Sequence, residues 1–338
     1  MGVCGPHPAA MKYMTQPENA RSGAGASQAP GGDQVRRFLI ENQPVRGHWV
    51  HLGPAWRDLR AHQEYPAPIR DLLGEAVVSS VLLAATLKFC GTLTLQFEGN
   101  GLLRLLIAQC THDFGVRAVA RFDAQALQGS IGKPAGGWTF RSLVGDAGRV
   151  IVTIEAGERD LRYQGVVPLA GESLPDSLEA YFTSSEQLPT RVRLAAGERE
   201  AAGLLIQKLP ETQDVDEGQD EADSVSSVWQ RAQLGVAALG PQELLDGSIE
   251  AVLAASLGRE DLRLFKAAPV RSECRCSPER VSELLRAIGQ AEVSDVIREQ
   301  GSVTVTCEFC QRPYRFTASD AEVLFGSDTV PPGSGALH

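Results

Sequence analysis

The chain lacks an excess of basic residues. Its 338 residues include 32 Lys and Arg against 42 Asp and Glu, which gives a formal net charge of −10. This balance argues against a broad phosphate-binding surface and against a polybasic face for membrane binding. We therefore expect neither nucleic acid nor membrane among the partners of this protein.

Long apolar runs are missing as well. The longest, from Ala76 to Leu87, is interrupted by Ser79, Ser80 and Thr86. It falls far short of the roughly 20 residues that a membrane-spanning helix needs. The first 30 residues contain no apolar stretch of the kind that a secretory signal requires. We therefore expect the protein to be cytoplasmic.

Motifs of common enzyme classes are also absent from the sequence. It contains no P-loop, GxSxG, HExxH or kinase motif set. The stretch Gly99-Asn100-Gly101 precedes a strand-like segment, which is unlike a dinucleotide-binding turn. His48 and His51 lie three residues apart, a spacing that on a strand places them on opposite faces rather than in one site. We expect no enzymatic activity.

The sequence does contain many short apolar segments separated by turn residues. The expected strands are 45–52, 92–97, 102–110, 116–122, 150–154, 162–167, 190–194, 203–209 and 262–265. The expected helices are 54–63, 68–89, 174–185, 224–239 and 242–257. Because hairpins predominate and βαβ repeats are not seen, the predicted class is α+β with a largely antiparallel sheet.

Composition divides the chain into four parts. Residues 1–32 are rich in Gly, Ala, Pro and Ser and predict a disordered tail, followed by an α+β core over 33–210. Residues 211–223 hold 7 acidic residues and no basic ones, so 211–270 is predicted to be an acidic and helical linker. Residues 271–338 form a small C-terminal domain that contains four cysteines.

Cysteine spacing is the most informative feature. Of 7 cysteines, Cys274, Cys276, Cys307 and Cys310 form a CxC and a CxxC pair separated by thirty residues. Four thiolates satisfy tetrahedral zinc and leave no open position for a substrate, so we expect one structural or redox zinc ion in the reduced protein. The CxC pair can bind the same ion only if its backbone is turned, because an extended strand points alternate side chains to opposite faces.

Three alternatives explain these four cysteines less well than a zinc site does: static disulfides, an iron–sulfur cluster, and four free cysteines that are close in sequence by chance. Static disulfides are rare in a reducing compartment. CxC is a poor match to the common spacings of iron–sulfur proteins. Four unconnected buried cysteines would have to arise by chance. Cys90 and Cys110 end apolar segments, which indicates that they fill the core.

The same four sulfurs predict redox sensitivity. Thiolates react with oxidants, and each pair is close enough in sequence to form its own disulfide. Disulfide sulfur is a poor zinc ligand, so oxidation should release the metal. We expect Cys307 and Cys310 to pair first, because the ring that joins Cys274 to Cys276 is tighter and more strained. A domain this small often depends on its metal for folding, so oxidation should unfold it.

Beyond the cysteines, several core segments carry a family resemblance. They are AATLKF at 84–89, YQGVV at 163–167, Tyr181-Phe182 and SEQLPT at 185–190. Together with CxC…CxxC, they resemble the 33 kDa chaperonin family, the redox-regulated heat-shock holdases of bacteria, from Val35 to about Phe325. The long N-terminal tail, Cys90 and Cys110 depart from that pattern.

The resemblance implies a fold and an activity. The fold would be an α+β chaperone core, a metastable helical linker and a C-terminal zinc domain that acts as a redox switch. The activity would be ATP-independent binding of unfolding client proteins under oxidative stress, with a homodimer as the active form. From the short helices and apolar residues of 211–270 themselves, we further expect the zinc domain to act as a clamp in the reduced state, and the core sheet to be the surface on which the apolar face of the linker helices packs. The residues of that face are Leu234, Val236, Leu239, Leu244, Leu245, Ile249, Val252 and Leu253.

Two alternatives remain open at this point. One is a zinc-ribbon protein that binds nucleic acid, although residues 271–338 hold 7 basic and 10 acidic residues, a net charge of −3 (7 − 10) that disfavours it. The other is a thiol–disulfide oxidoreductase. That class places CxxC at the start of a helix, whereas Cys307 follows the strand-like segment SVTVT.

Overall fold

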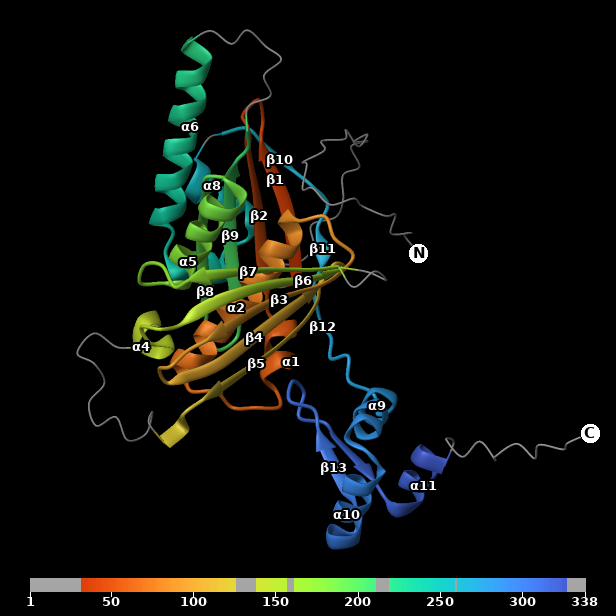
Figure 1. Ribbon diagram of the computed structural model, residues 1–338. Helices are drawn as coiled ribbons and strands as arrows, with labels where there is room; N and C mark the ends of the chain where they lie inside the picture. The colour runs from red at the N-terminus through yellow and green to blue at the C-terminus, as the bar shows by residue number, and fades with distance from the viewer. Residues whose placement is uncertain (1–31, 126–137, 157–160, 211–218, 259, 327–338) are drawn as a thin grey trace, which may run out of the picture.

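The computed structural model describes residues 32–125, 138–156, 161–210, 219–258 and 260–326 (Figure 1). The tail expected over residues 1–32 falls almost wholly outside these ranges, as does the part of the acidic stretch 211–223 up to residue 218; residues 219–223 are helical. Within them the protein combines two six-stranded sheets with helices and a small C-terminal module. The expected α+β class is confirmed.

Sheet A has the strand order β10-β1-β2-β9-β8, with β11 also beside β1, and every pairing is antiparallel. Its strands are β1 (Gln34–Ile40), β2 (Val45–Leu52), β8 (Thr190–Ala196), β9 (Ala201–Lys208), β10 (Leu262–Leu264) and β11 (Ala268–Pro269). Strand β1 is not among the strands expected from the sequence, because Arg36 and Arg37 interrupt its apolar pattern. The fold accommodates Arg36 through a hydrogen bond from its Nε to the Phe265 carbonyl oxygen at 2.9 Å.

Sheet B has the order β12-β5-β4-β3-β6-β7. Its strands are β3 (Gly91–Glu98), β4 (Leu103–Thr111), β5 (Gly115–Phe122), β6 (Arg149–Ala156), β7 (Leu161–Pro168) and β12 (Arg271–Ser272). The pairings are antiparallel except that between β12 and β5, which is parallel. A segment next to the cysteines therefore completes the edge of the core sheet.

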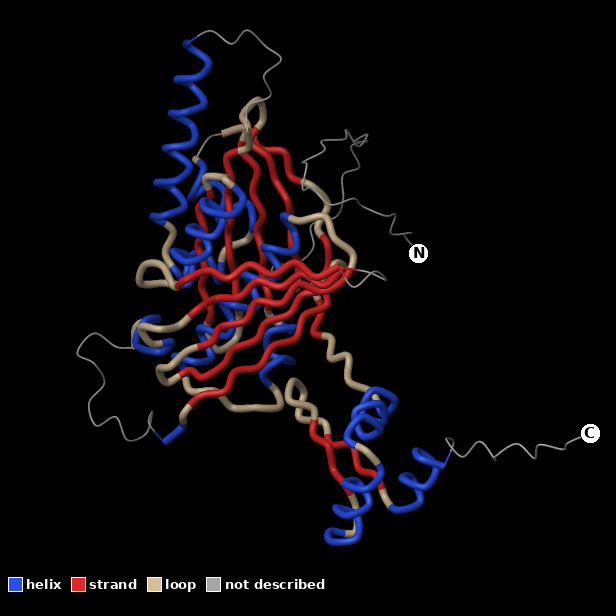
Figure 2. Tube along the Cα trace, in the orientation of Figure 1, coloured by secondary structure: helices blue, strands red, loops and turns tan. Residues whose placement is uncertain are grey.

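Helix α2 (Ala67–Thr86) lies between the two sheets and forms the centre of the main core. Most of its side chains are buried on all sides, as expected for a helix covered from opposite directions. Pro66 and Pro68 define its start. Figure 2 shows the strands of sheet B running across those of sheet A.

Shorter helices complete the core. They are α1 (Pro54–Arg60), α4 (Phe140–Val144), α5 (Leu174–Tyr181) and a turn of π-helix, η2 (Phe182–Glu186). Tyr181 and Phe182 are both 2% exposed and lie in the core.

Three helices cover the outer face of sheet A: α6 (Gln219–Ala238), α7 (Pro241–Asp246) and α8 (Ile249–Leu257). Six of the eight linker side chains expected to be covered are buried, and Leu245 is partly buried. Leu234 is the exception at 72% exposed. The buried positions of α6 include Val228, Ala232 and Val236, which recur every four residues, so Leu234 falls on the opposite face.

The single helix predicted over 242–257 is wrong, because two helices occupy that range. Gly247 has extended backbone angles and ends α7. Ser248 then begins α8, where its side chain accepts a hydrogen bond from the Ala251 backbone N–H.

The C-terminal module is built around its own small core. Its elements are α9 (Pro278–Ile288), α10 (Gln290–Gln300), β13 (Val303–Thr306), β14 (Pro313–Phe316) and α11 (Ala318–Gly326). Six buried side chains form that core: Val281, Leu285, Val293, Tyr314, Ala321 and Leu324. Figure 1 shows the module at the opposite end of the molecule from α6, so it does not clamp that helix directly.

Candidate metal centre

Two loops of the module carry the four cysteines. Cys274 and Cys276 follow β12 and precede α9, whose first turn is capped by the Ser277 side chain. Cys307 and Cys310 lie in the turn between β13 and β14. That turn is closed by hydrogen bonds from the Cys307 N–H to the Arg312 carbonyl and from the Gln311 N–H to the Cys307 carbonyl, at 3.0 and 2.8 Å.

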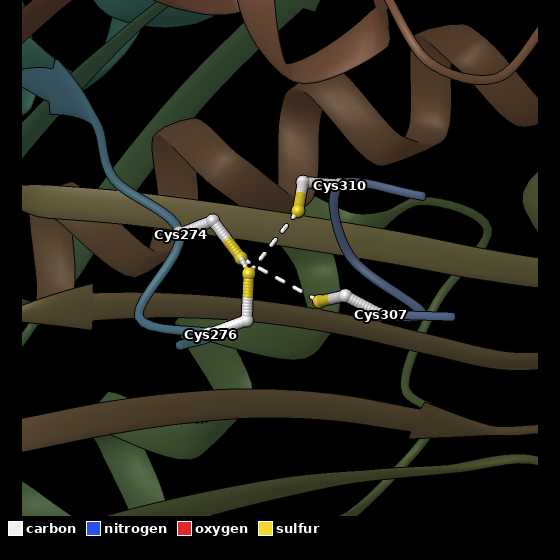
Figure 3. Close-up of side chains that lie close together, drawn as sticks. All are labelled: Cys274, Cys276, Cys307 and Cys310. Atoms are coloured by element: carbon white, nitrogen blue, oxygen red, sulfur yellow. Dashed lines mark hydrogen bonds between the residues drawn. The ribbon is translucent and has the colours of Figure 1, made fainter. Parts of the chain in front are cut away.

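The four sulfur atoms converge on one point (Figure 3). All lie within 4.8 Å of one another. The Sγ atom of Cys276 is 3.4 Å from that of Cys274 and 3.4 Å from that of Cys310, while Cys274 and Cys307 are 3.6 Å apart. The CxC backbone is therefore turned, as a shared ion requires.

These separations suit a four-sulfur metal site. A tetrahedral zinc ion with bonds of roughly 2.3 Å would hold its sulfurs about 3.8 Å apart. The donor set is entirely sulfur, which suits zinc and disfavours magnesium or calcium. Cysteine, histidine, aspartate and glutamate side chains can all bind metals. Within the described residues, these four cysteines are the group of such side chains that lie close enough together to hold one.

Tyr314 is a neighbour that sequence reasoning missed. Its hydroxyl donates a hydrogen bond to the Cys276 sulfur at 3.0 Å. Burial alone would raise the pKa of Cys276, but the bonds from Tyr314 and the other thiols outweigh it and lower that pKa to about 7. Burial raises the pKa of Cys274 to about 12. The Tyr314 ring also belongs to the module core, which links the sulfur centre to the packing of the module.

Arg117 is a second missed neighbour and comes from the core strand β5. Burial and the nearby Arg275 lower the pKa of Arg117, while the charges of Cys274 and Cys307 oppose that shift. Nothing in the sequence near Arg117 indicates this role, because more than 150 residues separate it from Cys274.

The remaining candidate residues lie elsewhere. Cys110 is fully buried in the main core, where burial raises its pKa, and Cys90 is partly buried. His48 and His51 are both buried on opposite faces of β2. Burial, with Arg46 and Arg37 nearby, lowers the pKa of His48 to about 3.

None of the helices in the described part of the chain has both the length and the apolar character that crossing a bilayer requires.

Comparison with known proteins gives a consistent result. A family model described as "Hsp33 protein" matches residues 33–317. The 33 kDa chaperonin of Methylobacillus flagellatus is 38% identical over 307 residues, which cover 90% of this chain and 99% of that protein. The 33 kDa chaperonin of Chromobacterium violaceum is 39% identical over 307 residues, 90% of this chain and 98% of that protein.

A solved structure shares the fold. The crystal structure of the 33 kDa chaperonin of Thermotoga maritima matches with a TM-score of 0.72 at 21% identity, covering 86% of this chain and 97% of that one. With the family model and the curated relatives, this agreement leads to one conclusion: the chain belongs to the Hsp33 family of chaperones.

Proposed function

We propose that this chaperone is a redox-regulated, ATP-independent holdase that binds unfolding client proteins under oxidative stress. The observation that carries the proposal is the convergence of four cysteine sulfurs in a chain of the Hsp33 family. The function needs no catalytic residue, and we assign none.

In the reduced state, Cys274, Cys276, Cys307 and Cys310 would hold one zinc ion as thiolates. The bound zinc would supply a structural crosslink between the two loops. Under peroxide, Cys274 pairs with Cys276 and Cys307 with Cys310. Each pair loses two electrons and forms one S–S bond, while one hydrogen peroxide takes up those electrons and two protons to give two waters. The resulting sulfurs bind zinc poorly, so the metal leaves.

Sulfur proximity does not by itself select this pairing, because Cys276 is as near to Cys310 as to Cys274. The pairing within each motif is favoured because its two cysteines lie on the same short loop. Cys274 with Cys276 and Cys307 with Cys310 can join without moving one loop past the other, whereas a cross-pair would keep both loops crosslinked after the metal has gone.

Loss of the metal would unfold the module because little else holds it. Its core contains six buried side chains, and structural zinc contributes on the order of 10–16 kcal/mol to the folding of such small units. We propose the boundaries 33–210 for the chaperone core, 211–270 for the linker and 271–338 for the redox-switch domain.

The linker would convert unfolding of the module into client binding. Helices α6 to α8 cover an apolar area of sheet A that includes Phe38, Ile40 and Trp49. The chain reaches the module from α8 through β10 and β11, which pair with β1, and β12, which pairs with β5. Unfolding of the module would disrupt the pairing of these short strands. Helices α6 to α8 would then pack less tightly on sheet A. The apolar surfaces exposed on helices α6 to α8 and on sheet A would then bind clients.

We propose unfolded proteins as clients, a homodimer as the active form and the cytoplasm as the location. A zinc-ribbon protein that binds nucleic acid is the alternative. The charge of −3 over residues 271–338 (7 − 10) speaks against it.

The test treats reduced, zinc-loaded protein with peroxide and follows zinc release, suppression of client aggregation and amide hydrogen exchange together. We expect one zinc per chain to be released, activity to appear and exchange over residues 224–257 to rise. Cys274→Ser should weaken zinc binding, whereas Cys110→Ala, a change outside the centre, should not.

Two results would contradict the proposal. One is activity that appears while exchange over residues 224–257 stays unchanged, which would place client binding elsewhere. The other is mass-spectrometric detection of disulfides that join the CxC to the CxxC pair.

A further inference from the structure

The contact between the C-terminal module and sheet B is small and polar. Arg271 pairs with Asp113 and Arg121 with Glu308, and all four side chains are well exposed. Exposed pairs of this kind contribute little to stability. An open cleft of about 490 Å³ lies beside them, lined by residues that include Val119 and Arg121 of β5 and Thr306 and Gln311 of the module. The few enclosed contacts must therefore carry most of the docking.

Arg117 makes one of the partly buried contacts between sheet B and the module. It lies on β5 between Val116 and Ala118, which face the main core, so its side chain projects from the opposite face of sheet B. Its Nε donates to the Gln109 side-chain oxygen at 2.7 Å, and Gln109 in turn donates to Thr94 at 2.9 Å. These two hydrogen bonds hold the guanidinium in place from the side of sheet B.

The other side of the guanidinium faces the sulfur centre. It lies 4.2 Å from the centroid of the Phe309 ring, and Phe309 lies inside the CxxC loop between Cys307 and Cys310. The sulfurs of Cys274 and Cys307 interact electrostatically with the same guanidinium. A second cation, Arg275, lies close to Arg117. Its guanidinium donates a hydrogen bond to the Thr92 hydroxyl of β3 at 2.9 Å.

Two half-buried arginines beside each other need negative charge nearby. Four thiolates with one divalent ion carry a net charge of 2−, whereas two disulfides carry none. The reduced centre therefore offsets the repulsion between Arg117 and Arg275, and the oxidised centre does not. The groups that face Arg117 from the module include Cys274, Cys307, Phe309 and Arg275, and the first two would lose their charge on oxidation.

We propose that Arg117 is a docking residue through which sheet B binds the module while its four sulfurs are thiolates and releases it when they become disulfides. This inference rests on the proposed redox function and adds a route from the sulfurs to the core. Release at Arg117 also removes support from the β12–β5 pairing, in which the Glu273 N–H donates to the Val116 carbonyl at 2.8 Å.

Three variants test the proposal. Arg117→Gln removes the charge and Arg117→Lys keeps it without the planar group. Arg121→Gln is the matched control, because Arg121 lies on the same strand and contacts the same module through an exposed pair. The readout is amide hydrogen exchange over 115–122 and 270–276 in reduced, zinc-loaded protein, with zinc and thiol content measured on the same samples. Exchange over α2 reports whether each variant is folded.

We expect Arg117→Gln to exchange roughly tenfold faster or more over these segments than wild type, because a charge-assisted contact is lost. Zinc content and thiol count should stay at the wild-type level. Arg117→Lys should fall between the two, and Arg121→Gln should match wild type. Peroxide should raise exchange over 115–122 in wild type and raise it by a smaller factor in Arg117→Gln, in which sheet B has already lost this contact with the module.

Wild-type protection in reduced Arg117→Gln would overturn the inference, and so would equal effects of Arg117→Gln and Arg121→Gln. Failure of the proposed function would look different. Wild-type protein would then keep its zinc, or gain no holdase activity, after peroxide, whatever the exchange of the variants in the reduced state.

Discussion

At the scale of single residues, the neighbours of the four cysteines would determine how firmly the centre could hold a metal. Four sulfurs supply the ligands, but Tyr314 donates to one of them from the module core. Such hydrogen bonds from the surroundings orient a ligand and stabilise its charged form. The aromatic ring and the hydroxyl of Tyr314 therefore act on packing and on metal binding respectively, and the two can be separated.

Tyr314→Phe removes the hydroxyl and keeps the ring. We expect zinc affinity of the reduced protein to fall about tenfold, which is the lower end of the effect of such neighbours. Competition with a chromophoric chelator measures it. Tyr163→Phe is the control, because Tyr163 is 46% exposed on β7, far along the sequence from the cysteines. Equal affinity in Tyr314→Phe and wild type would show that the hydroxyl does not matter.

Glu75 is a partly exposed acidic residue of the central helix α2, and it predicts a pH effect. Burial on α2 and the neighbouring Asp71 raise the pKa of Glu75 to about 7, with Arg193 opposing them. The folded protein therefore holds this proton more tightly than the unfolded chain, whose value is 4.5. Stability from this group is present at low pH and is lost as pH rises through about 7.

The variant Glu75→Gln should be more stable than wild type at pH 8, and the difference should shrink toward pH 5. The glutamine cannot ionise, so the slope of unfolding free energy against pH between these values should become flatter by about 1 kcal/mol per pH unit at most. Urea unfolding of the reduced protein at several pH values measures it. A slope unchanged by the substitution would contradict the assignment.

At the scale of elements, the packing of α6 on α8 leaves no room for a side chain at one point. A methyl group added to Gly235 of α6 would lie 1.8 Å from the Ser256 carbonyl oxygen of α8. Alanine in a helix is ordinarily more stable than glycine by roughly 0.5–1 kcal/mol. Here the clash with backbone atoms, which cannot rotate away, outweighs that gain.

Gly235→Ala should therefore separate α6 from α8. We expect faster hydrogen exchange over 224–257 in the reduced protein and partial holdase activity without oxidant, while the zinc content stays normal. Leu234→Ala is the control, since this neighbouring side chain is 72% exposed and its loss removes little packing. Slower exchange in Gly235→Ala would mean that helix propensity dominates and that the two helices can move apart at little cost.

A helix or strand could be predicted from the sequence where its residue pattern is set by neighbouring residues, and could not where distant partners stabilise it. The hairpins of sheet B and the buried helix α2 are indicated by alternation, turn residues and apolar runs. Strand β1 is not, because its arginines are accommodated only by distant partners such as the Phe265 carbonyl. The break between α7 and α8 depends on Gly247 and Ser248, whose local signal is weak beside the apolar pattern around it.

The same distinction applies to the candidate site. Cysteine spacing brings together all four sulfurs, because two short loops suffice to define them. Arg117 and Tyr314 come to the centre through the docking of the module and the pairing of β13 with β14, which no spacing rule encodes. Sequence motifs thus identify the candidate ligands, and tertiary structure identifies the side chains that contact them.

At the scale of the whole molecule, three apolar clusters of decreasing size predict an order of unfolding. The main core surrounds α2, a smaller cluster joins α6 to α8 with sheet A, and the module has six buried side chains. Local stability follows the amount of buried apolar surface, so the module should open first and the main core last.

Removing zinc from reduced protein with a chelator tests this order without forming any disulfide. We expect exchange over 278–326 to rise to nearly that of an unfolded chain, because the small apolar core cannot replace the 10–16 kcal/mol or so that a structural zinc contributes. Exchange over α2 should stay slow, because its core does not involve the metal. Adding zinc back should restore protection of the module, which separates metal loss from irreversible damage. A module that stays protected without zinc would show that its six buried side chains are enough, and oxidation would then have to act through the disulfides themselves.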